Sequence, residues 1–300
     1  MRLDKLGEFN FINRISKGPS LHKNVIRGIG DDAAVLKYAG NRYLLFTTDM
    51  LVEGRHFYRS HRPYLVGKKS VSCNISDIAA MGGRPAFFVV SLGAPGGLDT
   101  EYTDELYRGI KDTAKKFKVY MVGGDTVGSG KIIINIAMLG EVEKKNLVLR
   151  SGAKEGDAIF VTGSIGGSIK DRHFNFNPRL EEARFLVKNF KINSMIDVSD
   201  GLLADLGHIL EESGKGAVIY EKTVPVSKDA AGFDSAVRDG EDFELIFTLP
   251  RRQAARLENI WPFKTRLSRI GGIRSSRYGF SLERKSGKSK KIKPAGFTHF

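Results

Sequence analysis

The fold is decided by the stretch Phe46-Thr47-Thr48-Asp49-Met50-Leu51-Val52-Glu53-Gly54-Arg55-His56-Phe57. The apolar residues from Tyr43 to Phe46 predict a buried strand. This strand leads directly into two hydroxyls and a carboxylate, which are oxygen ligands suited to a hard cation such as Mg²⁺. His56 follows seven residues after Asp49. The stretch therefore predicts a strand that delivers polar side chains to a site at its end.

Other short segments also end in aspartate. They are Gly30-Asp31-Asp32, Asn74-Ile75-Ser76-Asp77, Gly123-Gly124-Asp125-Thr126 and Ile196-Asp197-Val198-Ser199-Asp200-Gly201. Taken alone, each is explained about as well by a turn, a solvated helix face or a helix cap. Five segments of the same kind are too many for chance turns, so we predict that their acids converge on several metal ions and a nucleotide.

Composition bounds the class of protein. The chain has 300 residues, enough for two domains, with 41% hydrophobic and 27% charged residues. Its single cysteine, Cys73, excludes an internal disulfide and a cysteine-based zinc cluster. No apolar run reaches the length of a membrane span, and residues 1–8 lack the apolar core of a signal peptide, so we predict a cytoplasmic protein with no membrane partner.

The net charge of +14 leaves two interpretations open. It fits a solvated basic surface that attracts phosphorylated substrates, and it fits a nucleic-acid-binding protein. The basic excess is densest in residues 284–293. We favour the solvated surface and expect no nucleic-acid partner.

Hydrophobic periodicity predicts an α+β protein. We expect helices over 6–17, 63–81, 99–117 and 178–189, and a further helix after Gly201 that is capped by Ser199-Asp200-Gly201. We expect strands over 33–36, 43–49, 86–92, 119–122, 131–140, 158–162, 194–198, 218–220, 243–248, 266–270 and 278–282. The domain boundaries follow as 1–145 and 146–300. The apolar strand Ile132 to Ile136 is expected to need cover from a second copy of the chain.

The aspartate segments supply what phosphoryl transfer requires. Such an enzyme positions the ATP phosphates, neutralises them with Mg²⁺ and aligns an acceptor. Glycine turns let backbone N–H groups approach phosphates, and the helix N-terminus after Asp200 adds a favourable dipole. The chain has neither a Gly-x-x-x-x-Gly-Lys-Ser/Thr loop nor a His-Arg-Asp kinase loop. It is therefore predicted to be neither a P-loop enzyme nor a protein kinase.

Several polar residues have a plain structural interpretation beside the functional one. His56 is either a polar residue after a strand or a substrate contact. Glu241 and Asp242 either form a loop rim or hold a cationic substrate. Cys73 is expected in the core because the sequence offers it no base partner, and Trp261 is expected to pack.

The ordered set of motifs resembles the thiamine-monophosphate kinase family. The motifs are Gly28-Ile-Gly-Asp-Asp-Ala-Ala, Thr47-Thr-Asp…Gly54-x-His56-Phe, Asn74-x-Ser-Asp-x-Ala-Ala-Met-Gly, Gly123-Gly-Asp-Thr, Arg150-Ser-Gly-Ala-Lys-x-Gly-Asp, Asp197-x-Ser-Asp-Gly-Leu, Gly240-Glu-Asp-Phe-Glu-Leu and Gly296-Phe-Thr-His-Phe. The resemblance covers nearly the whole chain. It implies ATP-dependent phosphorylation of thiamine phosphate to thiamine diphosphate, the last step of that cofactor's biosynthesis. It also implies a two-domain PurM-like architecture, in which an N-terminal α/β domain with a mixed sheet forms a homodimer and a C-terminal α/β domain follows.

Residue roles carry over motif by motif. The resemblance implies magnesium ligands at Asp32, Thr47, Thr48, Asp49, Asp77, Asp125 and Asp197, and a further one at Asp200. It implies ATP contacts from Tyr107, Gly124, Asp125, Arg150 and Ser199. It implies substrate contacts from His56, Glu241 and Phe297, and catalytic roles for Asp49, Asp77 and Asp125. The transfer would be direct and in line, with no phosphoenzyme and no obligatory general base.

Two departures and two alternatives complete the sequence interpretation. Residues 163–178 look shorter than in the family, and Pro294-Ala295 stands where a substrate-stacking aromatic is often found, so Phe297 or Phe300 is expected to compensate. The first alternative is a hydrogenase-maturation dehydratase, but that family is expected to end in a reactive cysteine and this sequence ends in Thr298-His299-Phe300. The second is a basic nucleic-acid-binding protein.

Overall fold

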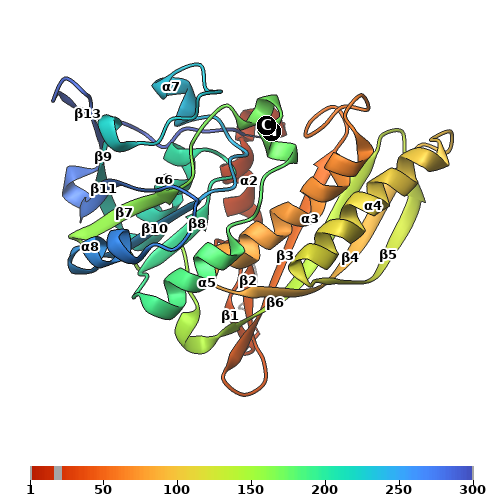
Figure 1. Ribbon diagram of the computed structural model, residues 1–300, viewed down its shortest axis with the longest axis horizontal. Coiled ribbons are helices and arrows are strands. Elements are labelled where there is room, and N and C mark those ends of the chain that lie inside the picture. Colours follow the sequence, from red (N-terminus) through yellow and green to blue (C-terminus); the bar gives the residue numbers. More distant parts are fainter. Residues whose placement is uncertain (1, 17–21, 299–300) are drawn as a thin grey trace.

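Two mixed β-sheets lie side by side in the computed structural model, which describes residues 2–16 and 22–298 (Figure 1). The first sheet has the order β1-β2-β3-β6-β4-β5 and the second β13-β12-β9-β11-β7-β10-β8. The strands of the first sheet are β1 (Val25–Arg27), β2 (Ala34–Lys37), β3 (Arg42–Val52), β4 (Arg84–Ala94), β5 (Tyr120–Gly128) and β6 (Ile133–Glu143). The predicted α+β class is confirmed.

The first sheet is built on β3. This strand pairs antiparallel with β6 from Arg42↔Glu143 to Val52↔Ile133, so it extends at both ends beyond the predicted 43–49. Only β4 and β5 pair in parallel, and β5 forms an edge of the sheet. Thr47, Thr48 and Asp49 therefore lie within a long central strand and not at its end, whereas His56 follows the strand.

Two helices cover one face of the first sheet. They are α3 (Pro63–Ala80) and α4 (Thr100–Phe117), close to their predicted bounds. Gly67 and Gly109 allow their backbones to meet, since a Cβ at either position would lie 2.0 Å from a carbonyl oxygen of the other helix. At the N-terminus, the helix predicted over 6–17 corresponds to α2 (Glu8–Ile15), and Gly7 separates it from a short helix that was not predicted, α1 (Leu3–Leu6).

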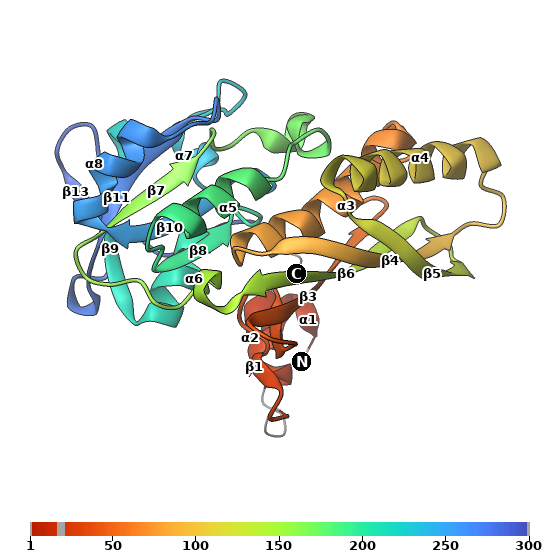
Figure 2. The ribbon, with the colours of Figure 1, turned by 60° about the horizontal axis from the view of Figure 1, so that its bottom comes forward.

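The opposite face of the first sheet is apolar and exposed. Figure 2 shows α3 and α4 on one side of β4 and β5 and no described element on the other side. Large exposed hydrophobic side chains on this face are Phe46 and Met50 of β3, Phe87 and Val89 of β4, and Tyr120 and Val127 of β5. The expectation that Ile132 to Ile136 would lack cover is wrong, because Ile132, Ile134 and Ile136 are fully buried. The uncovered residues belong to the other strands.

The second sheet is covered by helices on both faces. Its strands are β7 (Asp157–Thr162), β8 (Ser194–Asp197), β9 (Lys215–Tyr220), β10 (Leu245–Pro250), β11 (Leu267–Ser275), β12 (Phe280–Glu283) and β13 (Ser289–Lys291). Its helices are α5 (Leu180–Asn189), α6 (Leu202–Ser213), α7 (Phe233–Ala236) and α8 (Arg251–Ile260). The strand β13 was not predicted; it lies in the basic run and pairs with β12. The short segment before α5 forms two 3₁₀ turns, Ser168–Lys170 and Arg172–Phe174. These described residues contain no α-helix.

Helix α3 joins the two sheets into one packed body. Most of its residues are buried, and it contacts α5 and β8 of the second half as well as its own sheet. One hydrophobic core runs from Ile75 and Ile136 through Leu186 to Phe160 and Phe247. The boundary between residues 145 and 146 remains a prediction, and packing is continuous across it. No helix in the described ranges is long and apolar enough to cross a membrane.

Candidate active site

Several of the predicted polar segments meet at a pocket of about 590 Å³ between the two halves of the chain. Six predicted site residues line it, namely Asp49, His56, Ser199, Asp200, Glu241 and Phe297. Its other lining residues are Met50, Leu51, Val52, Arg55, Cys73 and Phe243. Residues almost 250 positions apart in sequence therefore share one cavity.

Three aspartates gather beside this pocket. Asp32 precedes β2, Asp77 lies on α3 and Asp197 ends β8, and each offers an oxygen within 4.8 Å of the other two. Thr47 donates a hydrogen bond of 2.5 Å to Asp77, and Ser76 donates one of 2.5 Å to Asp197. The second carboxylate oxygen of Asp32 is buried and has no hydrogen-bond partner among the described residues. An unpartnered buried anionic oxygen calls for a cation.

Electrostatics point the same way. Burial and the negative charge of Asp32 raise the pKa of Asp197 to about 8. Burial and the charge of Asp49 raise the pKa of Asp77 well above its usual range. Burial also raises the pKa of Asp49 to about 6, against the attraction of Lys69. These acids disfavour one another's charge, so the arrangement fits oxygen ligation of a divalent cation.

Arg150 connects the cluster to the second half of the chain. Its guanidinium donates to Asp32, with the closer nitrogen at 2.6 Å, and its backbone N–H donates to Asp31 at 2.9 Å. The charge of Asp32 raises the pKa of Arg150 above its ordinary value although burial lowers it. Arg150, the predicted ATP contact, therefore lies beside the acids. Its planar guanidinium can donate two parallel hydrogen bonds to a phosphate or a carboxylate.

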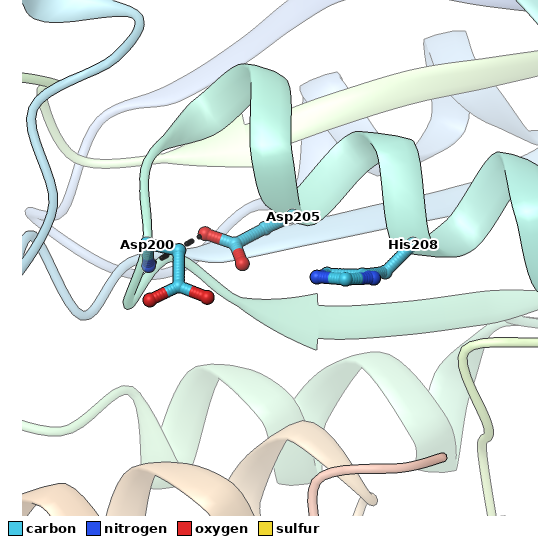
Figure 3. Close-up of side chains that lie close together, drawn as sticks. All are labelled: Asp200, Asp205 and His208. Atoms are coloured by element: carbon cyan, nitrogen blue, oxygen red, sulfur yellow. Dashed lines mark hydrogen bonds between the residues drawn. The ribbon is translucent and has the colours of Figure 1, made fainter. Parts of the chain in front are cut away.

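The N-terminus of α6 is capped from inside the helix. Asp205, and not the predicted Ser199-Asp200-Gly201, supplies the cap, because one of its oxygens accepts hydrogen bonds from the backbone N–H groups of Asp200 (3.1 Å) and Gly201 (3.0 Å) (Figure 3). His208 lies with Asp200 and Asp205 in a second group of possible ligands. Burial lowers the pKa of His208 to about 4. The cap leaves the Asp200 carboxylate, which lines the pocket, free of a capping role.

The other end of the pocket is formed by the loop 240–244. Glu241 and Phe243 both have left-handed backbone conformations, with φ of 64° and 50°, which residues with a Cβ seldom adopt. Glu241 is paired with Lys69 of α3 and with His173. Phe243 stacks on Phe176 at 4.1 Å between ring centroids. Backbone strain of this kind is concentrated at functional sites.

The C-terminal segment lies across the same end. The backbone N–H of Phe297 donates to Asp200 at 2.8 Å, and the Arg55 guanidinium stacks over the Phe297 ring at 4.6 Å. Arg55 also donates to the carbonyl of Thr298 at 2.6 Å. Pro294 does not line the pocket but packs on Gly207 of α6, where a Cβ would meet its ring at 2.6 Å. The proposal that Pro294 stands where a substrate-stacking aromatic is often found stays a prediction; His299 and Phe300 lie outside the described residues.

Four predicted site residues are not brought to the pocket in this chain. Thr48 leaves β3 on the opposite face from Thr47 and Asp49, and it donates to Asn135. Asp125 and Gly124 lie on the edge strand β5; the row Asp49↔Ile136↔Val90↔Gly124 puts them three strands, or roughly 14 Å, from Asp49. Gly124 also has a packing reason, because a Cβ would lie 2.1 Å from the Val90 carbonyl oxygen. Tyr107 packs against the first core.

Three single residues with open interpretations, His56, Cys73 and Trp261, have clear structural contacts. His56 lies in the turn after β3, where Nδ1 accepts a hydrogen bond from the Val52 backbone (3.0 Å), and it also lines the pocket. Cys73 is buried, and burial raises the pKa of its thiol well above the usual range, so it is a poor nucleophile. Trp261 packs on Phe185 and Phe263.

Sequence reasoning missed Arg55, Lys69, His173 and Phe243. A signal existed for Lys69, because Lys69, Cys73 and Asp77 are spaced by four residues and so share one face of α3 with the predicted ligand. A lysine on a buried helix face beside an aspartate is a candidate for an internal ion pair. No sequence pattern indicated His173, because its position at the site depends on how the short 163–178 segment folds.

Comparisons with known proteins agree with this geometry. Residues 30–142 and 154–259 match the models of AIR synthase related protein, N-terminal and C-terminal domain. The thiamine-monophosphate kinase of Buchnera aphidicola subsp. Schizaphis graminum is 35% identical over 325 residues, covering 98% of each chain. The solved complex of AaThiL with AMPPCP and TMP has a TM-score of 0.87 at 32% identity and covers 100% of this chain and 99% of its own.

A second solved structure separates fold from activity. Hydrogenase maturation protein HypE in complex with ATP has a TM-score of 0.72 at 23% identity, covering 86% of each chain, and this likeness shows a shared fold alone. The two-domain AIR synthase-like architecture and the full-length relatives therefore agree, and the chain belongs to the thiamine-monophosphate kinase family.

Proposed function

We propose that this protein transfers the γ-phosphoryl group of ATP to the phosphate of thiamine phosphate, giving thiamine diphosphate and ADP. The observation that carries the proposal is the pocket in which Asp49, Ser199, Asp200 and Glu241 converge, in a chain of this family. The acid cluster lies beside Asp49, whereas Phe243 and Phe297 lie at the loop 240–244 together with Glu241. The first group suits Mg²⁺ and phosphate chains, and the second suits an organic ring system that carries a positive charge.

The acid cluster and Asp49 fit Mg²⁺. Asp32, Asp49, Asp77 and Asp197 offer carboxylate oxygens, and neither the free oxygen of Asp32 nor the Asp49 carboxylate accepts a hydrogen bond from a described residue. Mg²⁺ held there would neutralise phosphate charge and align the two substrates. Thr47 and Ser76 orient Asp77 and Asp197 through their hydroxyls, and Arg150 fixes Asp32. Asp200, at the pocket wall, is the further predicted ligand.

The phosphoryl transfer itself does not require a side chain to act as a general base. The acceptor oxygen belongs to a phosphate that is already anionic, so no residue has to remove a proton from it. The attacking oxygen forms a bond to the γ-phosphorus while the bond to the β–γ bridging oxygen breaks, and ADP leaves with the electron pair. Arg150 and the N-terminus of α6, beside Ser199 and Asp200, place positive potential where the phosphates would lie. Positioning and charge stabilisation therefore carry the rate.

The residues at the loop 240–244 fit the rings of thiamine phosphate. Phe297 and Phe243 present aromatic surface, and Glu241 presents a carboxylate to a ligand whose thiazolium ring is cationic. Nδ1 of His56 accepts a hydrogen bond from the Val52 backbone, and the imidazole lines the pocket. These contacts would hold the acceptor in one orientation relative to the acids.

We further propose a homodimer formed through the exposed face of the first sheet. The support is the row of exposed apolar side chains on β3, β4 and β5, since a contiguous apolar face of this kind marks an interaction surface. In such a dimer, Gly124 and Asp125 would serve the site of the other copy, because β5 lies three strands from β3 in the same chain. Location in the cytoplasm remains a prediction, in keeping with the free buried thiol of Cys73.

The test is a coupled assay of ADP release with product analysis. Purified protein with MgATP is expected to release ADP only when thiamine phosphate is present and to form thiamine diphosphate in equal amount. Thiamine is the matched control acceptor, because it has the same rings without the phosphate. ADP release that does not depend on thiamine phosphate would contradict the proposal and favour another ATP-dependent reaction of this fold.

A further inference from the structure

Lys69 is a buried cation at the substrate end of the pocket. Its side chain comes from α3 and is fully buried. Its ammonium nitrogen lies 2.5 Å from Glu241 Oε2, 2.7 Å from His173 Nδ1 and 3.5 Å from the His56 carbonyl oxygen. One ammonium group therefore reaches the turn after β3, the 3₁₀ turn before α5 and the loop before β10.

The two oxygens of the Glu241 carboxylate have different environments. Oε2 is held by Lys69 and lies 2.5 Å from His173 Nδ1. Oε1 accepts no hydrogen bond in the described part of the chain, and the side chain is 20% exposed at the pocket. Although burial raises it, the contacts with His173 and Lys69 lower the pKa of Glu241 to about 2. Glu241 is thus an anchored anion with one oxygen left for a ligand.

The backbone conformation of Glu241 is one that surrounding contacts, such as the ion pair with Lys69, must maintain. Glu241 has φ of 64°, and the next residue but one, Phe243, has φ of 50°. A left-handed conformation is unfavourable for residues with a Cβ and persists only where surrounding contacts impose it. The backbone of Glu241 donates to the Ser199 carbonyl at 2.7 Å, and Lys69 holds the side chain from the other side.

We propose that Lys69 is a positioning residue for the acceptor substrate, acting through Glu241. The inference rests on the proposed function and adds to it a residue that does not itself touch substrate. Lys69 holds Oε2 so that Oε1 points a fixed negative charge at the cationic ring of thiamine phosphate. His173 supports the same carboxylate from the short 163–178 segment, so this segment contributes to the site despite its length.

The test compares steady-state constants of Lys69→Met with those of the parent protein. Methionine keeps the length and the buried volume and removes the ammonium. The KM for thiamine phosphate is expected to rise roughly tenfold to a hundredfold, because a displaced positioning group costs that much. The KM for ATP is expected to stay unchanged. Lys68→Met is the matched control, since Lys68 is the neighbouring lysine on α3, is only partly buried and hydrogen-bonds to Asn175 and not to Glu241.

A double-mutant cycle separates positioning from stability. If Lys69 acts through Glu241, Lys69→Met/Glu241→Gln has the same KM for thiamine phosphate as Glu241→Gln alone. Additive losses in the double variant would overturn the inference. Should Lys69→Met fail to fold, the double variant leaves no unpaired charge and gives the same comparison. Lys69→Arg should recover part of the lost affinity, because it restores a donor to Glu241.

The outcomes distinguish this inference from the proposed function. A parent protein that forms no thiamine diphosphate overturns the proposed function and the inference with it. An active parent whose Lys69→Met variant keeps its KM for thiamine phosphate, or loses ATP affinity to the same extent, overturns the inference alone.

Discussion

Neighbouring side chains on β3 point to opposite faces of the sheet. Thr47 and Asp49 point to the buried side and reach the acids of α3 and β8, whereas Thr48 points to the exposed side and meets Asn135. The cause is the two-residue period of a strand. A motif of consecutive polar residues in a strand therefore supplies ligands to a site from alternate positions only.

The carboxylate of Asp49 is expected to matter for turnover and not for folding. Asp49→Asn keeps the shape and removes the charge, so kcat should fall on the order of 10³-fold or more while the circular dichroism spectrum is retained. Removing one of several repelling acids should leave the melting temperature equal or higher. Asp104→Asn, an exposed aspartate on α4, is the control. Near-normal turnover of the folded variant in saturating Mg²⁺ would refute the site assignment.

The ring of Phe297 is expected to contribute to acceptor binding. A cation over an aromatic face is stabilised by about 0.5–2 kcal/mol. Phe297→Ala should therefore raise the KM for thiamine phosphate several-fold and leave the KM for ATP alone. The exposed aromatic Tyr278 supplies the control variant Tyr278→Ala. An unchanged KM for thiamine phosphate would show that the C-terminal segment does not hold the substrate.

At the scale of elements, α3 organises the molecule. Its N-terminal half packs on α4, its C-terminal half carries Ser76 and Asp77 to the acid cluster, and Lys69 between them reaches the loop 240–244. A helix that is buried on nearly all sides has no strong amphipathic stripe, which is why its sequence periodicity shows only part of its packing. The positions of the site residues on α3 depend on how deeply the helix sits between the two sheets.

The contact between α3 and α4 predicts a sensitive glycine. A Cβ on Gly109 would lie 2.0 Å from the Tyr64 carbonyl oxygen, so Gly109→Ala must push the helices apart. We expect the free energy of unfolding to fall by about 1–3 kcal/mol, the usual cost of overpacking, in denaturant titrations. Gly97→Ala, at a position with open space around it, should have little effect. Equal stability of Gly109→Ala and the parent would mean that the helices do not approach this closely in solution.

On the scale of the whole molecule, the exposed apolar face of the first sheet predicts self-association. Light scattering at micromolar concentration should give twice the chain mass of 33.2 kDa. Val89→Asp places a charge in the middle of that face and should give monomers with reduced activity, since a buried unpaired charge is costly. Ile169→Asp, at an exposed apolar residue of the second half, is the control. A monomeric parent protein would contradict the homodimer.

The acid cluster predicts a pH-dependent stability that Mg²⁺ removes. Asp49 and Asp197 have pKa values of about 6 and about 8 in the folded chain, against 3.8 ordinarily, so the folded state binds more protons than the unfolded state between pH 4 and 8. In EDTA, stability should therefore fall as pH rises through this window. Mg²⁺ binds the ionised acids, so it should raise the melting temperature more at pH 8 than at pH 5.5. A shift that is the same at both pH values would argue against ligation by these acids.

The sequence by itself determined the elements and the order of the polar segments. Local pattern was enough for α3, α4, the strand that carries Asp49 and the acidic end of β8, because side-chain period and turn chemistry act over a few residues. The same segments identified the family and six of the residues that line the pocket.

Only the tertiary structure decided which of these residues meet. Asp125 shares the local pattern of Asp77, yet strand order places it on a distant edge, because sheet pairing joins segments by register and not by motif. Lys69, His173 and Glu241 come together from three separate segments whose contact depends on how α3 packs against the second half. A buried charge is stable only where folding supplies its partner, and that partner can lie anywhere in the chain.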